Sequence, residues 1–463
     1  MPAADVTLSE QLAHWIATLR YEDLPPETVH HVRRCLLDHL GVTIAGAGSP
    51  IARTVRNYLL SSEGPGEASL PGTQMALSVP NAAFANGTAA SVLELDDGHA
   101  QAAIHIGATA IPAIMATAQA RGASCRDVVV ATAAAYEVAA RLAIATRKSA
   151  ERGFNATPLI GVFGAAAGTS KILGSEARAI AHALGMAGSD AGGLFDYHGG
   201  WLDSWCINVG RTARNGVVCA HLADAGIAGP LDIFHGPRGF ATAFTDGALD
   251  GEQALRGLGR HWLMLQTYVK PYPCCRRLHS VIDAVLALRP QLASCVEAID
   301  RILVETSTES ARLDGRTFDS MSAAQMSIGY GVAAALLFGA PRLDHFGENT
   351  RGDSRIRALV ERIEVSASDD PSITAGRSTA RVSVVGGGVT MSETVSEPLG
   401  NPANPVDDQA LEAKFLDLTE PVLGQQAALR LAQMVWRFGE APSAPGDKDG
   451  LAFLRDLAPA HAG

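Results

Sequence analysis

Apolar residues recur at three- and four-residue spacing over most of the first 263 residues, and this helical period limits the possible folds more than any other feature. The run Leu36, Leu37, Leu40 is one example. Aromatic residues make up 5% of the chain while hydrophobic residues make up 47%, so small and aliphatic side chains must fill the interior. Gly161, Gly164 and similar small residues favour helices that pack closely on one another. We therefore expect a large helical body.

The most apolar stretch, residues 128–146, is rich in alanine and is interrupted by Glu137 and Arg141. These charges indicate a buried helix of a soluble protein, and no membrane association is expected. Residues 1–20 contain Asp5 and Glu10 in place of a basic start and an apolar run, so no secretory signal is expected. The cytoplasm is the expected location.

Charge and cysteine usage narrow the function classes. The formal net charge of −11 and the absence of a long Lys/Arg run argue against a nucleic-acid partner, because phosphate binding needs a concentrated basic surface. Seven cysteines are scattered without a C-x-x-C pair, which indicates reduced thiols in a cytosolic protein.

A second domain is expected after residues 270–273, where two prolines spaced two apart restrict the backbone. Strands are expected at 302–304, at 363–365, and at 380–385 with 389–391, the last two forming a hairpin with a glycine turn. A helix is expected at 322–338, between the first two strands. Beyond residues 401–405 the helical period returns. The chain is therefore predicted to be mainly α, with an all-helical domain (1–265 plus 400–463) and a smaller inserted α+β domain (266–399).

The densest polar cluster consists of Glu94, Asp96, Asp97, His99 and His105 in an apolar region. Buried charges need partners, so this concentration favours a site, and His105 is the main functional candidate. For the two aspartates, a catalytic role and a role as helix caps are equally good interpretations. Asp and His side chains also bind divalent ions, but this spacing does not indicate a metal site.

A second cluster lies at the predicted domain junction, where active-site clefts commonly form. Lys270, Arg276 or Arg277, and His279 would supply cations for carboxylate groups. A solvated basic turn is the alternative. The two cysteines of this segment are interpreted as packing residues. Tyr330, between two glycines, is a further candidate, with a core tyrosine as the alternative.

Familiar cofactor motifs do not occur in the sequence: there is no Walker loop, no complete dinucleotide fingerprint, no esterase or zinc-peptidase motif and no iron–sulfur spacing. Residues 36–42, 85–90 leading to Asp96 and Asp97, 161–166, 236–240, and 270–275 with His279 instead resemble, in order, the MmgE/PrpD family. This family includes 2-methylcitrate dehydratase, cis-aconitate decarboxylase and iminodisuccinate epimerase.

The resemblance implies a helical domain with an inserted α+β domain, a homodimer, and an active site between domains that needs no cofactor. It also implies four catalytic residues by position: Glu94, His105, Lys270 and Tyr330. The chain departs from the family pattern at Asn155, where a histidine is usual, at Trp205, where a lysine is usual, and at Asn208, where a histidine is common. These changes indicate a substrate with fewer carboxylates, or a larger and partly apolar one that stacks on Trp205.

The expected chemistry is proton transfer at the carbon beside a carboxylate of a small polycarboxylic acid. His105 would carry the proton, oriented by Glu94 or Asp96, with Lys270 binding carboxylate oxygens and Tyr330 as second acid. The substrate-binding candidates are Asp96, Asp97, His99, Asn155, Trp205, Arg276 and His279. A lyase, either dehydratase or decarboxylase, is expected, with an epimerase and a non-catalytic carboxylate-binding protein as alternatives.

Overall fold

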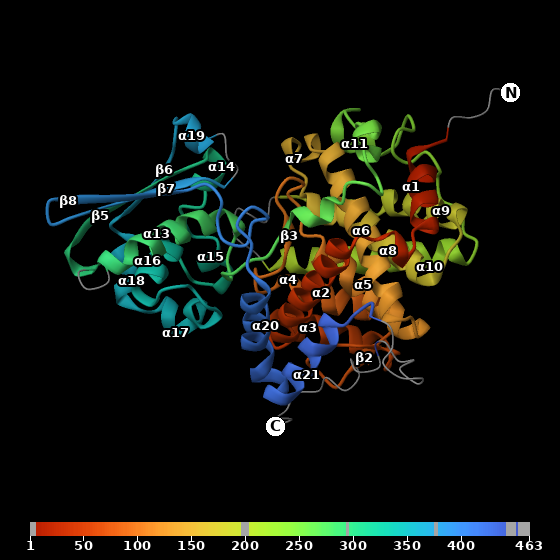
Figure 1. Cartoon of the computed structure of the whole chain (residues 1–463), viewed down its shortest axis with the longest axis horizontal. Helices are drawn as coiled ribbons and strands as arrows, with labels where there is room; N and C mark the ends of the chain where they lie inside the picture. Colours follow the sequence, from red (N-terminus) through yellow and green to blue (C-terminus); the bar gives the residue numbers. More distant parts are fainter. Residues whose placement is uncertain (1–5, 196–202, 293–295, 375–377, 441–450, 452–463) are drawn as a thin grey trace.

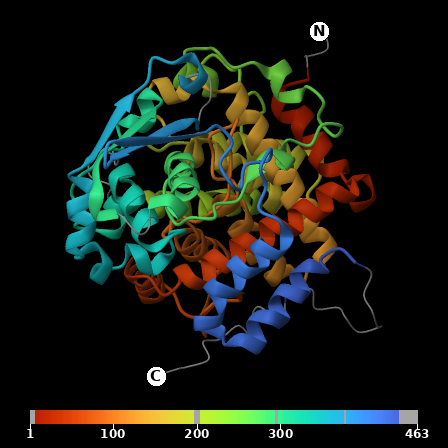
Figure 2. The same ribbon diagram turned by 60° about the vertical axis from the view of Figure 1, so that its left-hand side comes forward.

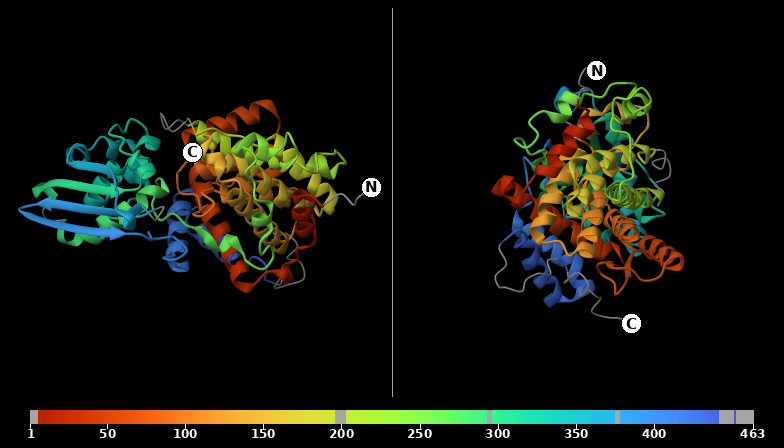
Figure 3. Two further views of the ribbon diagram at one scale, coloured as in Figure 1. Left: turned by 90° about the horizontal axis from the view of Figure 1, so that it is seen from above. Right: turned by 90° about the vertical axis from the view of Figure 1, so that its right-hand side faces the viewer.

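The computed structural model describes residues 6–195, 203–292, 296–374, 378–440 and 451, and these are mainly α-helical (Figure 1). Helices from the first half of the chain form one large body, and a four-stranded sheet with its helices lies to one side of it (Figure 1). Seen from above, the two parts meet along a narrow region that contains α20 (Asp408–Leu423) (Figure 3).

Twelve helices described before residue 266 build the body: α1 (Leu8–Thr18), α2 (Pro26–Gly46), α3 (Pro50–Ser62), α4 (Val79–Ser91), α5 (Gly107–Arg121), α6 (Cys125–Ala145), α7 (Lys148–Glu151), α8 (Ala156–Leu173), α9 (Ala177–Ser189), α10 (Ser204–Asp224), α11 (Phe240–Thr245) and α12 (Gly251–Leu255). Local sequence signals explain several of the ends. Ser124 and Asp127 form a reciprocal capping box that begins α6. Gly122 and Gly174, both with positive φ, end α5 and α8.

Close helix packing depends on glycines, as the sequence indicated. A Cβ added to Gly161 of α8 would lie 2.6 Å from the Thr109 hydroxyl oxygen of α5, and one on Gly164 would lie 3.0 Å from Ala139 of α6. Helices α6 and α8 are long and apolar enough to cross a membrane, but their most apolar windows are 100% and 83% buried inside the protein. They are core helices, as expected for residues 128–146.

The helical body also contains two short antiparallel ladders, so the expectation of an all-helical domain needs correction. Strand β1 (Ala68–Ser69) pairs with β2 (Ala76–Leu77), and β3 (Gly98–His99) pairs with β4 (Thr267–Tyr268). Each strand has only two residues, too few to produce a period that a sequence could reveal. The β3–β4 ladder joins two segments about 170 residues apart and leads directly to the candidate site.

The smaller part contains the predicted strands and the predicted hairpin. Its elements are α13 (His279–Leu292), β5 (Ile299–Thr306), α14 (Thr308–Ala311), α15 (Met321–Gln325), α16 (Ile328–Phe338), α17 (Glu348–Arg351), α18 (Ser354–Val360), β6 (Ile363–Ala367), α19 (Pro371–Thr374), β7 (Ala380–Gly386) and β8 (Val389–Val395). The strand order is β6-β5-β7-β8, with β5 and β6 parallel and the other pairs antiparallel. Gly387 and Gly388, both with positive φ, form the hairpin turn.

One helix prediction in this part is wrong in detail. The stretch 322–338 forms two helices, α15 and α16, because Ser327 leaves the helical conformation and its side chain accepts a hydrogen bond from the backbone N–H of Tyr330. Serine at an N-cap position competes with the preceding helix in this way.

The last helices, α20 and α21 (Gln425–Trp436), pack beside α2 of the first segment (Figure 2). The largest hydrophobic cluster accordingly combines residues from Leu8 to Val269 with residues from Val406 onward, while a second cluster runs from Tyr272 to Val384. The proposed domain boundaries stay a prediction, to which these two clusters lend support. Six cysteines are free thiols, and Cys295 lies outside the described residues.

The close contact between α2 and α4 gives a stability prediction. A Cβ on Gly46 would lie 2.0 Å from the Ala89 carbonyl oxygen, whereas the nearest atom to a Cβ on Gly48 is 3.6 Å away. We expect Gly46→Ala to lower the free energy of unfolding by about 1–3 kcal/mol through overpacking, and Gly48→Ala to leave it nearly unchanged. Urea denaturation of both variants checks this. Equal midpoints for the two would contradict the packing described here.

Candidate active site

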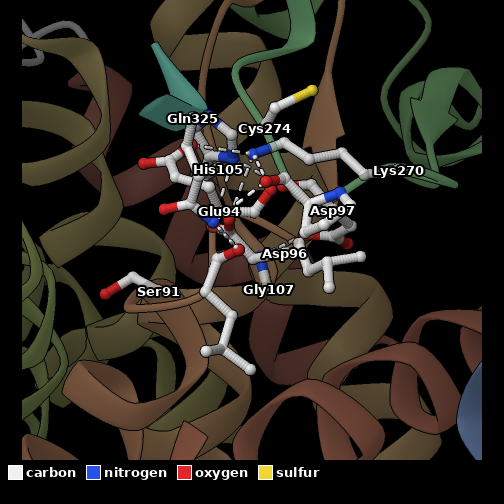
Figure 4. Close-up of polar contacts among 12 residues, drawn as sticks. Ser91, Glu94, Asp96, Asp97, His105, Gly107, Lys270, Cys274 and Gln325 are labelled. Carbon is white, nitrogen blue, oxygen red and sulfur yellow. Dashed lines mark hydrogen bonds and ion pairs between the residues drawn. The ribbon is translucent and has the colours of Figure 1, made fainter. Parts of the chain in front are cut away.

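Four charged side chains, three of them buried and one partly exposed, meet where the loop 92–97 faces the segment that follows β4 (Figure 4). The Lys270 ammonium lies 3.1 Å from Glu94 Oε2 and 3.4 Å from Asp96 Oδ1, and its side chain is 0% exposed. The other oxygen of Asp96 lies 3.1 Å from His105 Nδ1. The β3–β4 ladder ends two residues before Lys270 and begins one residue after Asp97, which explains why these groups meet.

Side chains from different segments hold the backbone of this loop. Four of its carbonyl groups accept hydrogen bonds: Leu93 from Gln325 Nε2 (2.8 Å), Glu94 from Lys270 Nζ (3.1 Å), Leu95 from Lys414 Nζ (3.0 Å) and Asp97 from His105 Nδ1 (2.8 Å). Glu94 has a φ of 51°, a left-handed conformation that few residues other than glycine adopt. Such strain persists only where the surroundings enforce it, and it is concentrated at functional sites.

His105 has the environment of a proton carrier. Its Nδ1 is engaged by the Asp97 carbonyl and the Asp96 carboxylate, which leaves Nε2, among the described residues, as the nitrogen that can meet a ligand. The side chain is 20% exposed, and the rings of Trp205 and Tyr268 lie edge-on to it at 5.9 and 6.4 Å. Burial, the largest single influence, and the Lys270 charge lower the pKa of His105, but the Asp96 and Glu94 carboxylates together raise it above 6.5.

The ion pairs shift the pKa values of Asp96 and Lys270 so that both groups stay charged. Burial would raise the pKa of Asp96, but His105 and Lys270 lower it below its ordinary value. Burial would lower the pKa of Lys270, but Glu94 and Asp96 raise it. Lys270 is therefore an ammonium group and Asp96 a carboxylate at neutral pH. Removing one partner of such a buried pair costs about 3–5 kcal/mol, because the other charge loses its compensation.

The two aspartates divide the roles that the sequence left open. Asp96 pairs with the cations, whereas Asp97 acts as a cap: its Oδ1 accepts the Gly107 N–H at the start of α5 (3.1 Å), and its Oδ2 accepts the Tyr136 hydroxyl. Burial raises the pKa of Asp97 to about 7. Gly107 is required here, because a Cβ would lie 2.6 Å from both Asp97 Oδ1 and the Tyr136 oxygen.

Three of the predicted binding residues bond to the protein itself. The guanidinium of Arg276 lies over the Tyr268 ring, and it donates to the Leu399 carbonyl (3.0 Å) and to the Asn401 side chain. His279 is fully buried, and its Nδ1 lies 2.8 Å from Arg276 Nη1.

His99 is fully buried as well. Its Nε2 lies 2.9 Å from the Leu263 carbonyl oxygen, and its Nδ1 accepts the Ala102 N–H. Burial lowers the pKa of His99 to about 4. These contacts indicate that Arg276, His279 and His99 support the junction and do not face a ligand in this conformation.

Tyr330 is not brought to the cluster. Its hydroxyl donates to the His345 carbonyl (2.6 Å), and its ring lies between those of Phe318 and Phe346. This is the environment of a core tyrosine, the alternative that the sequence left open.

Asn155 lies one contact away from His105. Its side chain accepts the Thr157 N–H and caps α8, while the Thr157 hydroxyl accepts the His105 backbone N–H. The structure thus brings together six of the predicted site residues: Glu94, Asp96, Asp97, His105, Lys270 and Trp205. Asn155 is linked to His105 through Thr157.

Sequence reasoning missed four residues that hold the site: Asp38, Tyr136, Gln325 and Lys414. Asp38 of α2 was a charge inside an apolar helical period, which is a usable signal, and its carboxylate is 2.6 Å from Lys414 Nζ. Tyr136 could have been noticed as an aromatic residue in an alanine-rich helix. Gln325 and Lys414 have no local signal, because mixed polar residues are ordinary on helices.

The chain matches two domain models of one protein family and several curated proteins along most of its length. The MmgE/PrpD N-terminal domain matches residues 10–252, and the MmgE/PrpD C-terminal domain matches residues 272–439. Among curated proteins, a cis-aconitate decarboxylase of Aspergillus terreus is 27% identical, with 92% of each chain covered. A cis-aconitate decarboxylase-like protein, oryM, of Aspergillus oryzae is 26% identical, with 94% of each covered. The cis-aconitate decarboxylase of Mus musculus is 25% identical, with 88% of this chain and 86% of the relative covered.

The electrostatics of the site give a second prediction. In an Asp96→Asn variant, burial would act on His105 without its main carboxylate partner, so its pKa should fall below 6.5 instead of lying above it. Titration of the His105 Cε1–H signal by NMR, assigned with a His105→Gln variant, measures this. An unchanged pKa would show that Asp96 does not act on the imidazole.

Proposed function

Since the chain belongs to the MmgE/PrpD family, we propose that it is a cofactor-independent lyase that transfers a proton at the carbon next to a carboxylate of a small polycarboxylic acid. The single observation that supports this most is the pairing of His105 with the buried Asp96 carboxylate. The homodimer is proposed from the family resemblance alone, and the cytoplasmic location from the scattered cysteines.

His105 is proposed as the proton carrier, with Nε2 as the reacting atom. Asp96 stabilises the imidazolium form, as an anionic partner 3.1 Å away must, and the Asp97 carbonyl fixes the ring so that the proton on Nδ1 stays inside the protein. A raised pKa keeps a fraction of the imidazole protonated near neutral pH, where it can act as acid as well as base.

Both lyase reactions can use this arrangement. In a decarboxylation, the bond to a carboxylate breaks, carbon dioxide leaves, and the electron pair left on carbon takes the proton from His105. In a dehydration, neutral His105 removes the proton beside a carboxylate, the carbon–oxygen bond breaks, and the imidazolium returns that proton to the hydroxyl, which leaves as water. The names of the relatives favour decarboxylation.

An epimerase is the second candidate, and it would need a proton carrier on each face of the reacting carbon. Tyr330, the predicted second acid, has its hydroxyl bonded to the His345 carbonyl, which favours a lyase over an epimerase. The third candidate, a protein that only binds a carboxylate, does not account for a strained loop and a paired imidazole.

The charge balance supports a substrate with fewer carboxylates than a tricarboxylate. The Lys270 ammonium is held by two protein carboxylates, and the Arg276 guanidinium by protein oxygens, so neither cation neutralises a ligand in this conformation. Each further unpaired like charge at about 5 Å would cost about 3 kcal/mol at an effective dielectric constant of about 20. Trp205, beside His105, offers an apolar surface for the rest of such a substrate.

Incubation with mono-, di- and tricarboxylic acids in deuterated water tests the reaction class. We expect deuterium incorporation together with alkene formation or carbon dioxide release, and faster turnover of acids with two carboxylates than of cis-aconitate or 2-methylcitrate. Exchange without any net product would mean an epimerase. No change with any acid would contradict the proposed enzyme, and fastest turnover of a tricarboxylate would contradict the substrate class alone.

Replacing His105 by alanine should abolish the reaction found in that panel. Among the described residues Asp96 forms ion pairs with His105 and Lys270, and of these two only the imidazole exchanges protons near neutral pH. The loss expected is at least about 100-fold in kcat, the usual contribution of a general acid or base. His14→Gln, at an exposed position of α1, is the matched control and should keep full activity. Full activity of His105→Ala would remove the proposed proton carrier.

A further inference from the structure

We propose that Lys414, on helix α20, is a positioning residue for the His105 site: its ammonium group fixes the Leu95 peptide so that Asp96 faces His105. This role rests on the proposed function, but it concerns a residue that lies 319 positions from Leu95 in sequence, outside the two polar clusters. Lys414 does not touch the imidazole. It acts through the backbone of the loop 92–97.

The contacts of Lys414 are short and mostly buried. Its Nζ lies 2.6 Å from Asp38 Oδ1 on α2 and 3.0 Å from the Leu95 carbonyl oxygen. The side chain of Lys414 is 13% exposed and that of Asp38 is 1% exposed. The ammonium therefore links three segments: α20, α2 and the site loop.

Leu95 is the residue at which a fixed peptide has the greatest effect. It lies between Glu94, whose backbone is left-handed, and Asp96, which pairs with His105. Lys270 donates to the carbonyl of Glu94, the residue before Leu95. Lys414 donates to the Leu95 carbonyl, which lies in the same peptide plane as the Asp96 N–H. If this plane turns, the Asp96 carboxylate moves away from the imidazole, since side-chain direction follows the backbone.

A simpler role for Lys414 would be to neutralise Asp38 alone. Burial raises the pKa of Asp38, although Lys414 lowers it, so Asp38 would take up a proton more readily without its partner. The two roles predict different behaviour once Asp38 is made neutral. Asp38→Asn removes the buried charge and leaves the bond between Lys414 and Leu95 available.

The experiment measures the pKa of His105 by NMR titration of its Cε1–H, which needs no substrate and so gives a result even if the proposed reaction is wrong. The variants are Lys414→Met, Asp38→Asn and the double variant Asp38→Asn/Lys414→Met. Lys171→Met is the matched control, because Lys171 also donates to a single backbone carbonyl, that of Ala17, at 3.0 Å. Thermal unfolding establishes that each variant is folded at the temperature of the titration.

We expect the His105 pKa to fall by about one pH unit in Lys414→Met and equally in the double variant, because Asp96 no longer holds the imidazolium. It should stay unchanged in Asp38→Asn and Lys171→Met. The direction is informative, since loss of a positive charge alone would raise the pKa. With the acid that the protein turns over fastest, kcat should fall about 10- to 100-fold with KM nearly unchanged, as expected for a displaced reacting group.

Three results would overturn the proposal. An unchanged or raised His105 pKa in Lys414→Met would show that the loop keeps its shape without the ammonium. A His105 pKa in the double variant equal to that of the unaltered protein would show that Lys414 acts only on Asp38. Failure of the double variant to fold would assign Lys414 to stability and not to positioning.

Discussion

The buried ammonium group of Lys270 between Glu94 and Asp96 is the interaction on which the rest of the site depends. It joins a loop of the helical body to the segment that leads into the smaller part, and it lies directly beyond the β3–β4 ladder that brings the two together. A buried cation of this kind is stable only with well-placed anions. The strained backbone of Glu94 and the orientation of Asp96 are parts of the same arrangement.

From this centre the charges extend in two directions. On one side, Asp96 pairs with Lys270 through one oxygen and with His105 through the other, and the His105 ring is the most exposed of these groups. Toward the protein side, Asp97 caps α5 through Gly107, and Asp38 pairs with Lys414 of the C-terminal helices. A single loop thereby couples His105, the proposed proton carrier, to three separate parts of the fold, which is why small displacements far from the imidazole should affect the proposed chemistry.

Much of the fold could be predicted from sequence, because long periodic segments and a glycine turn carry strong local signals. The helix at 128–146 and the hairpin around Gly386 to Gly388 are examples. The β3–β4 ladder could not be foreseen, since two-residue strands have no period and their pairing is decided by tertiary packing. The break at Ser327 was missed because a capping serine inside an apolar stretch looks like an ordinary helical residue.

For the site, sequence identified the charged residues but not their directions. Lys270 was expected to face a carboxylate substrate, and it faces Glu94 and Asp96, because an ammonium that becomes fully buried takes the nearest anions as partners. Arg276 and His279 likewise turn toward each other. Lys414 was missed altogether, since no local pattern marks a surface-helix lysine whose partner lies hundreds of residues away.

Crystal structures of the unaltered protein and of a Lys270→Met variant would show whether the Lys270 ion pairs orient Asp96. We expect Lys270 Nζ to bond to Glu94 and Asp96 in the unaltered protein, and Asp96 to turn away from His105 once the ammonium is removed. An unaltered protein in which Lys270 and His105 lie far apart, or a variant in which Asp96 and His105 remain paired, would contradict this role of Lys270.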